Sequence, residues 1–235
     1  MVEREPITVI CSEKGWIRAA KGHIDDDGEV KYKEGDEGRF WLHAQTTDRI
    51  LLFSTNGRFY NLSAAKLPGG RGAGDPVRLV VDLPNDEDIV TLMVFKPGQK
   101  LLVASSDGRG FIVAEDDTLA QTRNGRQVLN LGSGAEAVSC RPADGDTVAV
   151  IGENRKLVLF PAAELPTMAR GRGVVLQRYR DGGLADAKVF EFAEGLTWAS
   201  GDRTRTERDL DDWVGKRAQA GRLAPKGFSK SGRFG

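Results

Sequence analysis

Long hydrophobic runs are missing from this sequence of 235 residues, and its longest apolar stretches, such as residues 50–53, end after a few positions. A helix that crosses a membrane needs about 20 consecutive apolar residues, so we expect no membrane span. The charged residues Glu3, Arg4 and Glu5 predict that the chain does not open with a signal peptide.

Cysteine and histidine are both scarce. Cys11 and Cys140 are the only cysteines; they lie far apart, and each stands in an apolar stretch typical of a strand. This is no disulfide framework, so we expect two reduced core residues of a cytoplasmic protein. His23 and His43 do not have the spacing of a zinc site with either cysteine.

Patterns that carry chemistry are also absent. The glycines of residues 69–74 lack the Gly-Lys-Ser/Thr ending of a phosphate-binding loop, and no Ser/His/Asp constellation can be assembled. The acidic run at 25–27 lacks the spaced ligands and central glycine of a calcium loop, which favours a solvated loop. The sequence therefore predicts no catalytic residue, no metal site and no cofactor in this chain.

A net charge is missing as well, since 34 Lys and Arg balance 34 Asp and Glu. This argues against a strongly basic nucleic-acid-binding surface, but the two signs are separated along the chain. Residues 121–180 hold 9 basic and 5 acidic residues, and from Trp213 onward there are 6 basic residues and none that is acidic. A polyanion would therefore meet a local patch, with a weak and salt-sensitive attraction.

Glycine, in contrast, is abundant, with 29 residues, and much of it belongs to a repeated pattern. An apolar run leads into a short polar turn and then into a second strand, as in residues 50–60 and 101–112. Asn-Gly and Asp-Gly between such strands indicate β-hairpins. The aligned turn positions are 15, 57, 108, 155 and 203.

Each repeat also has a third strand and a fourth, which predicts about four strands per repeat and five repeats. Such periods indicate a propeller-like array. We expect an all-β, five-bladed disc of four-stranded blades and leave open whether its first and last blades meet. The expected parts are an extension at 1–5, repeats at 6–48, 49–94, 95–145, 146–192 and 193–228, and a flexible basic tail at 229–235. Single helical turns are expected at 162–165 and 209–213.

A glycine-rich turn with arginine follows the hairpin of the later repeats, at residues 67–74, 121–126, 165–173 and 215–222. We name these the Gly-Arg turns 1 to 4. Glycine lets the backbone approach a ligand closely, and the guanidinium is a planar, permanent cation suited to phosphate. One such turn would indicate only a tight connection, but the recurrence predicts a row of cations that follows a polyanion without reading bases.

The opening repeat, Ser12-Glu13-Lys14-Gly15-Trp16-Ile17-Arg18-Ala19-Ala20-Lys21-Gly22-His23, resembles the first blade of the C-terminal domain found in the A subunit of topoisomerase IV. Residues 32–36, 53–60, 67–77, 123–126 and 160–161 also resemble that family, so the likeness covers about residues 5 to 228. It implies a β-pinwheel whose blades exchange a strand with a neighbour. It also implies binding and bending of duplex DNA, which helps an ATP- and magnesium-dependent type II topoisomerase select the segment for strand passage.

The related gyrase family carries a Gln-Arg-Arg-Gly-Gly-Lys-Gly box in its first blade, whereas residues 21–30 here lack it. A gyrase-like DNA-wrapping domain and a propeller-type scaffold for protein binding therefore remain the alternatives. The resemblance implies a non-catalytic, monomeric domain in the cytoplasm, at the nucleoid. Its partners would be duplex DNA, the N-terminal part of the same polypeptide and the ATPase subunit. The expected DNA contacts are Lys21, Arg71, Arg123, Arg126, Arg170, Arg172, Lys216, Arg217 and Arg222.

Overall fold

The computed structural model describes residues 1–25, 28 and 30–235. Within these residues the chain forms strands and short 3₁₀ segments and has no α-helix. The 3₁₀ segments are η1 (Ala64–Lys66), η2 (Val77–Leu79), η3 (Glu115–Thr118), η4 (Ala162–Glu164), η5 (Phe192–Glu194) and η6 (Asp211–Trp213). The two helical turns expected from the sequence correspond to η4 and η6. None of these segments has the length and apolarity that a membrane crossing demands.

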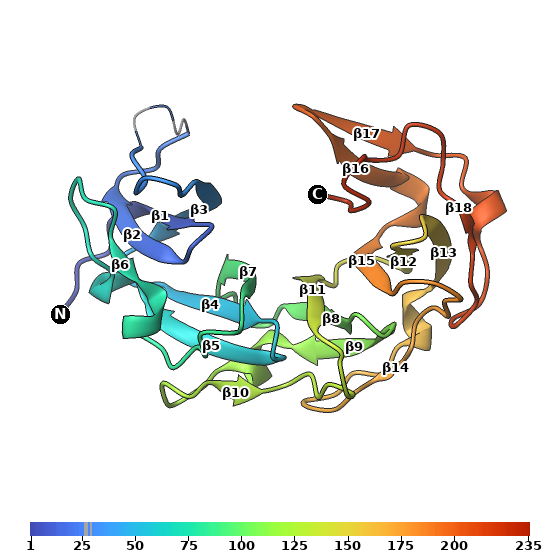
Figure 1. The fold of residues 1–235 in the computed structure, drawn as a ribbon, viewed down its shortest axis with the longest axis horizontal. Coiled ribbons are helices and arrows are strands. Elements are labelled where there is room, and N and C mark those ends of the chain that lie inside the picture. The colour runs from blue at the N-terminus through green and yellow to red at the C-terminus, as the bar shows by residue number, and fades with distance from the viewer. Residues whose placement is uncertain (26–27, 29) are drawn as a thin grey trace. The chain divides into compact units, whose positions relative to one another are not determined.

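Five antiparallel sheets, which we number blades 1 to 5, contain all the strands (Figure 1). Blade 1 has the order β3 (Gly38–Gln45), β1 (Pro6–Ser12), β2 (Trp16–Lys21), β6 (Asp75–Pro76). Blade 2 has the order β7 (Ile89–Val94), β4 (Arg49–Ser54), β5 (Arg58–Ser63), β10 (Arg126–Gln127). Blade 3 has the order β11 (Ala137–Pro142), β8 (Lys100–Ser105), β9 (Arg109–Ala114), β14 (Val174–Val175). Blade 4 has the order β15 (Leu184–Phe190), β12 (Thr147–Gly152), β13 (Lys156–Pro161), β18 (Arg222–Leu223), and blade 5 pairs β16 (Leu196–Ser200) with β17 (Arg203–Glu207).

The fourth strand of each four-stranded blade comes from the following repeat. Strand β6 lies in the second repeat but pairs with β2 of the first, and β14 lies in the fourth repeat but pairs with β9 of the third. β10 and β18 have the same relation to β5 and β13. The strand exchange that the family resemblance implied is therefore present in all four of these blades.

The hairpin turns account for the recurring glycines. Gly15, Gly57 and Gly108 end turns of three residues with φ of 83°, 80° and 86°, and in blade 4 Arg155 takes this conformation at φ 65°. In blade 5 the expected turn position, Arg203, is wrong, because Arg203 begins β17 and the positive φ of 62° falls on Gly201. This hairpin closes over two residues instead of three, so the register derived from the other four does not transfer to it.

Blade 5 also departs from the expected four strands, since in the described residues it consists of β16 and β17 alone. Four of the five residues of β17 are exposed, whereas β13 of blade 4 has four buried residues in succession. The side chains explain the difference, because β17 with Arg203 and Arg205 contains only arginine, threonine and glutamate, whereas the third strand of each other blade contains apolar residues.

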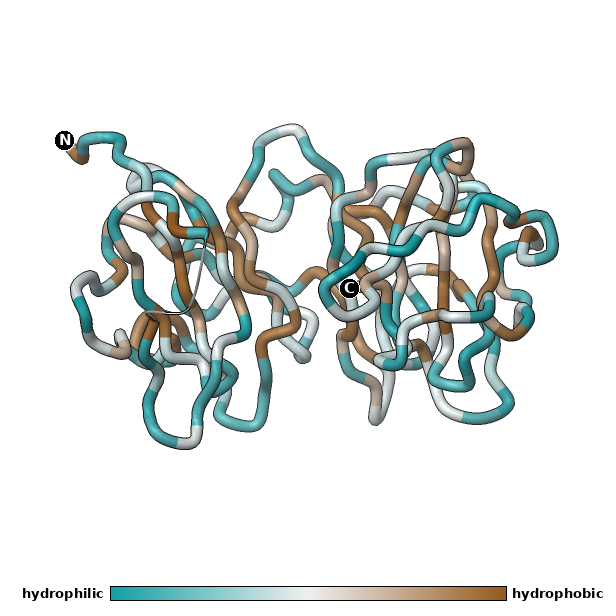
Figure 2. Tube along the Cα trace, turned by 90° about the horizontal axis from the view of Figure 1, so that it is seen from above, coloured by the Kyte–Doolittle hydropathy of each residue, from teal (hydrophilic) through white to brown (hydrophobic). Residues whose placement is uncertain are grey.

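The chain forms two compact units. Unit 1 comprises residues 1–54, 58–96 and 119–126, and unit 2 comprises residues 55–57, 97–118 and 127–235. Within each unit the apolar residues follow the strands, and the connecting loops are polar (Figure 2). Cys11 lies in the apolar core of unit 1 and Cys140 is buried in unit 2, as expected, and neither forms a disulfide. Burial raises the pKa of the Cys11 thiol to about 12 and also raises that of Cys140.

Residues 229–235, for which the sequence predicted a flexible basic tail, pack against blade 5 within unit 2. The backbone N–H of Ala199 in β16 donates to the carbonyl of Phe234 at 2.9 Å, and Phe234 is buried. The ring of Phe228 lies between Phe234 and Trp198, with centroid distances of 5.8 and 5.3 Å. The last residues of this segment therefore cover the edge of β16 that β17 leaves unpaired.

Candidate nucleic-acid interface

Each Gly-Arg turn leads directly into the fourth strand of a blade. Its final glycine has a positive φ, and a Cβ at that position would collide with a carbonyl of the third strand, as Gly173 would with Gly110. The equivalent glycines are Gly74, Gly125, Gly173 and Gly221, with φ of 88°, 74°, 77° and 81°. The carbonyls they face belong to Ile17, Phe59, Gly110 and Leu157. The glycine is thus required by close packing of the turn on the blade.

The start of the turn is fixed to the same strand. In blade 1 the N–H of Ala19 donates to the carbonyl of Pro68 at 2.8 Å, and in blade 3 the N–H of Ile112 donates to the carbonyl of Pro166 at 3.0 Å. Both prolines follow a leucine at the beginning of the turn. Because both ends of turns 1 and 3 are held, the central arginines of these two turns project from a defined place on the blade.

Two arginines on third strands, which the sequence analysis did not identify, donate hydrogen bonds to the backbone of turns 2 and 3. Arg58 of β5 donates from Nε to the carbonyl of Asn124 at 2.9 Å and from Nη2 to that of Gly125 at 3.2 Å. Arg109 of β9 donates from Nη1 to the carbonyl of Gly173 at 3.2 Å. Both directly follow the last glycine of a hairpin turn, as Gly57-Arg58 and Gly108-Arg109. This repeated pair was the signal in the sequence that could have identified them.

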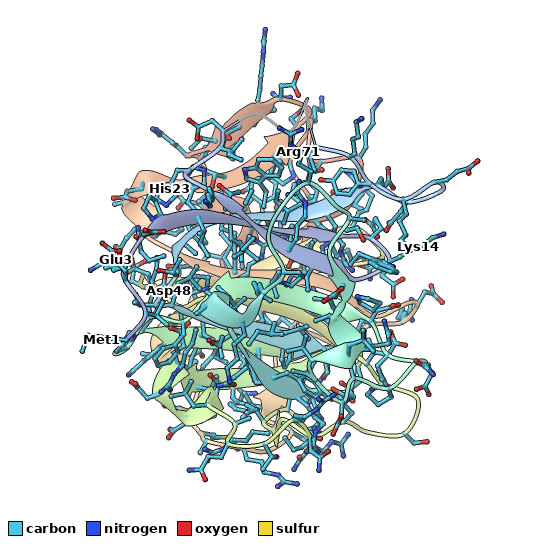
Figure 3. The ribbon with its side chains drawn as sticks, turned by 90° about the vertical axis from the view of Figure 1, so that its left-hand side faces the viewer. Met1, Glu3, Lys14, His23, Asp48 and Arg71 are labelled. Carbon is cyan, nitrogen blue, oxygen red and sulfur yellow. The ribbon has the colours of Figure 1, made fainter. Side chains whose placement is uncertain are left out.

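Five of the nine expected DNA-contacting side chains are exposed and unpaired. In the part of the chain that the structure describes, they have no hydrogen-bond or ion-pair partner; they are Lys21, Arg71, Arg126, Lys216 and Arg222. They come from the third strand of blade 1 and from turns 1, 2 and 4. Lys21 and Arg71 both belong to unit 1, and Figure 3 shows Arg71 on the loop that passes over the sheet of blade 1.

A hollow of about 730 Å³ lies beside Arg71 in unit 1. Among the described residues that line it, Arg18, Lys31 and Arg71 are cations and Asp25 is the one carboxylate. Arg18 is itself buried, and its Nη1 donates to the carbonyl of Gly70 at 2.9 Å, which fixes turn 1. The rest of the expected acidic loop, Asp26 and Asp27, lies outside the described residues.

Arg123 of turn 2 is exposed but engaged within unit 1. Its Nε lies 3.3 Å from Oδ1 of Asp82, and its Nη2 donates to the carbonyl of Leu79 at 2.9 Å. The backbone N–H of Asp82 donates in return to the carbonyl of Arg123 at 2.9 Å. Turn 2 is therefore tied to the segment that follows β6.

Arg170 and Arg172 of turn 3 have partners in unit 2. Nε of Arg170 lies 3.3 Å from the side-chain oxygen of Asn130, and Nη2 of Arg172 lies 3.5 Å from Oδ2 of Asp107. About half of the Arg172 side chain remains exposed, at 51%. Ion pairs this exposed are weak and screened by salt, so both arginines remain available to a phosphate.

Arg217 of turn 4 has a different position. It is half-buried, and its Nη1 donates to the carbonyl of Val175 in β14 at 2.8 Å. The N–H of Ala218 donates nearby to the carbonyl of Leu176 at 2.9 Å. Within unit 2 these bonds join turn 4 to the strand that follows turn 3, so Arg217 links neighbouring turns.

Groups that could hold a metal are not found among the described residues, where no three His, Cys, Asp or Glu side chains gather. His23 and His43 stack with their ring centroids 4.5 Å apart, and their Nε2 atoms lie 3.0 Å from the carbonyl of Ala44 and 2.9 Å from that of Ile24. These contacts hold the connection between β2 and β3. The candidate site is thus the set of cationic Gly-Arg turns.

Known proteins are similar to this chain in sequence and in fold. The family described as the DNA gyrase C-terminal domain, a beta-propeller, matches residues 48–96, 99–144 and 146–184. The A subunit of DNA topoisomerase 4 from Caulobacter vibrioides is 49% identical over 235 residues, which is 100% of this chain and 31% of that protein. Its counterpart in Rickettsia bellii is 45% identical over 99% of this chain and 32% of that protein. The chain therefore spans about a third of these relatives.

Solved structures agree with the sequence comparison. The C-terminal domain of E. coli ParC matches with a TM-score of 0.81 and 26% identity, covering 96% of each chain. A C-terminal domain of DNA topoisomerase IV matches with a TM-score of 0.78 over 95% of this chain and 73% of that one, and its 17% identity supports the fold alone.

Proposed function

This chain belongs to the DNA gyrase C-terminal domain family. From this premise we propose that it binds duplex DNA through the Gly-Arg turns without reading the base sequence. The observation that carries the proposal is structural equivalence. Four turns occupy the same position on four blades, each is fixed by a glycine against the third strand, and all four contain a cation. A turn that only closed a blade would not need an exposed cation each time.

Contacts to phosphate fit these turns better than contacts to bases. The described residues contain no α-helix that could lie in the major groove. Short loops with guanidinium groups suit the phosphate backbone, and such contacts position DNA without specifying sequence. The neutral total charge of the chain limits long-range attraction, so the binding depends on these local groups.

We further propose that the turns bend the duplex, because cations on several blades would neutralise phosphates on one side of it. In the whole protein this would help select the segment for ATP-dependent strand passage. The relatives are named as the A subunit of DNA topoisomerase 4, which supports that role. Catalysis, ATP and magnesium would belong to the remainder of that protein and to its ATPase subunit. This chain would be a non-catalytic monomer that acts on the nucleoid in the cytoplasm.

Gyrase-like wrapping is the alternative within the same family, and the missing basic box in residues 21–30 argues against it. The two roles differ in handedness. A wrapping domain changes the linking number of nicked circles that are sealed while it is bound, whereas a bending domain leaves the linking number close to that of naked DNA.

DNA binding itself is tested by fluorescence anisotropy with two labelled duplexes of equal length and unrelated sequence. We expect equal affinities for the two and a linear fall of log K with log salt concentration, with a slope of roughly −4.5 to −7 for about five to eight phosphate contacts. Absence of binding at micromolar protein in low salt, or binding that salt does not change, would refute the proposal.

A further inference from the structure

Two aspartates contact the proposed DNA-binding arginines, one in each unit. Asp82 pairs with Arg123 in unit 1, and Asp107 pairs with Arg172 in unit 2. The aspartates come from different places in the repeat, since Asp82 follows η2 and Asp107 lies in the hairpin turn of blade 3. The two ion pairs therefore use aspartates at positions that are not equivalent in the repeat.

The Asp107 carboxylate is held in place on several sides. The Ser105 hydroxyl donates to its Oδ1, and only 34% of its side chain is exposed. Gly132 packs against the pair, because a Cβ there would lie 2.6 Å from Nη2 of Arg172 and 3.3 Å from Oδ2 of Asp107. Arg172 and Asp107 thus share a fitted position on the surface of unit 2.

Asp82 is joined to turn 2 by both side chain and backbone. Its carboxylate accepts from Arg123, and its N–H donates to the carbonyl of the same residue. The backbone bond therefore keeps Asp82 next to turn 2, within reach of the Arg123 guanidinium.

A phosphate and a carboxylate compete for one guanidinium. Both are acceptors that suit its planar fork. A phosphate that replaces the aspartate must break the existing ion pair, and the aspartate that remains nearby repels it at short range. We propose, on the basis of the proposed function, that Asp82 and Asp107 act as intramolecular competitors that weaken DNA binding by occupying Arg123 and Arg172.

This competition explains why a DNA-binding surface retains acids beside its cations. The unpaired cations, such as Arg71 and Arg126, give a basal attraction that the aspartates do not affect. The two paired arginines contribute only when the duplex is close enough to displace a carboxylate. DNA would therefore be held loosely and released readily, as a domain that passes successive segments to an enzyme requires.

The test replaces each aspartate by asparagine, which removes the negative charge and keeps the size and shape of the side chain. Asp107→Asn retains an oxygen that can accept from Ser105, and Asp82→Asn retains its backbone bond to Arg123. In duplex anisotropy at low salt, each variant should bind about threefold to tenfold more tightly than the wild type, and the slope of log K against log salt should steepen by up to about one for each substitution. Asp144→Asn in unit 2 and Asp86→Asn in unit 1 are the controls, because both are exposed, lose the same charge and lie outside the Gly-Arg turns.

The double variant Asp107→Asn/Arg172→Gln separates competition from general repulsion. If Asp107 acts through Arg172, the gain in affinity disappears when Arg172 is absent; if it persists, the inference is wrong. Affinities of Asp107→Asn and Asp82→Asn equal to those of their controls, or below that of the wild type, also overturn it. A wild-type chain that fails to bind DNA at low salt instead refutes the proposed function, so the two failures are distinct.

Discussion

Replacing Asp186 by alanine should lower the free energy of unfolding of unit 2 by about 3–5 kcal/mol, because it leaves buried donors unpaired. The carboxylate is completely buried and accepts from Arg141 at 2.7 and 3.2 Å and from the Ser139 hydroxyl at 3.0 Å. It also accepts from the backbone N–H of Phe234 at 2.9 Å, and Nη2 of Arg233 lies 3.7 Å from its Oδ1. Asp186 thus joins blades 3 and 4 to the C-terminal segment that covers blade 5.

Urea denaturation followed by tryptophan fluorescence measures this effect, since Trp198 and Trp213 both lie in unit 2. Asp144→Asn is the matched control, as an exposed acid of the same unit that should change stability by less than about 0.5 kcal/mol. If Asp186→Ala unfolds at the same urea concentration as this control, the carboxylate is not the structural junction described here.

Replacing Gly173 by alanine should both destabilise unit 2 and weaken DNA binding. The residue has a φ of 77°, and a Cβ would collide with the carbonyl of Gly110 and lie 2.9 Å from the Phe111 ring. The left-handed conformation costs an L residue about 1–2 kcal/mol, and the collision adds about 1–3 kcal/mol. Because the turn must move away from β9, Arg170 and Arg172 lose their positions.

Gly134→Ala provides the control for backbone strain. Gly134 lies in the same unit at a φ of 74°, but nothing lies within 4 Å of its added Cβ. Thermal unfolding should show a small loss for Gly134→Ala and a clearly larger one for Gly173→Ala, and duplex anisotropy should show weaker binding for Gly173→Ala alone. Equal losses of stability in the two variants would mean that packing of the turn against β9 is unimportant.

The sequence predicted those features that repeat along the chain. Four of the five hairpin turns lie where their polar residues placed them, and the Gly-Arg turns lead into strands because one glycine recurs at each junction. The strand exchange was predicted from the family resemblance and not from periodicity. A fourth strand of two residues, such as β6, is too short to show an alternation of apolar and polar residues.

Features that depend on contacts between distant residues could not be predicted. The partner of Arg172 is Asp107, 65 positions away, and that of Asp186 is Arg141, 45 positions away. Nothing local distinguishes these aspartates from the solvated acids of the loops. The two-residue turn of blade 5 was also missed, because the alignment that fitted the first four hairpins placed Arg203 in a turn that had already ended at residue 202.

The salt dependence of DNA binding by Arg170→Gln/Arg172→Gln tests the central claim, that the Gly-Arg turns hold phosphates. Arg203→Gln/Arg208→Gln is the control, because both arginines are exposed in unit 2, outside these turns, and their loss removes the same charge. We predict that the turn variant binds duplex DNA more weakly and that its slope of log K against log salt is shallower than that of the wild type by between about one and two. The control should keep nearly the wild-type slope. A turn variant with the wild-type slope, or with the same reduction as the control, would contradict the account.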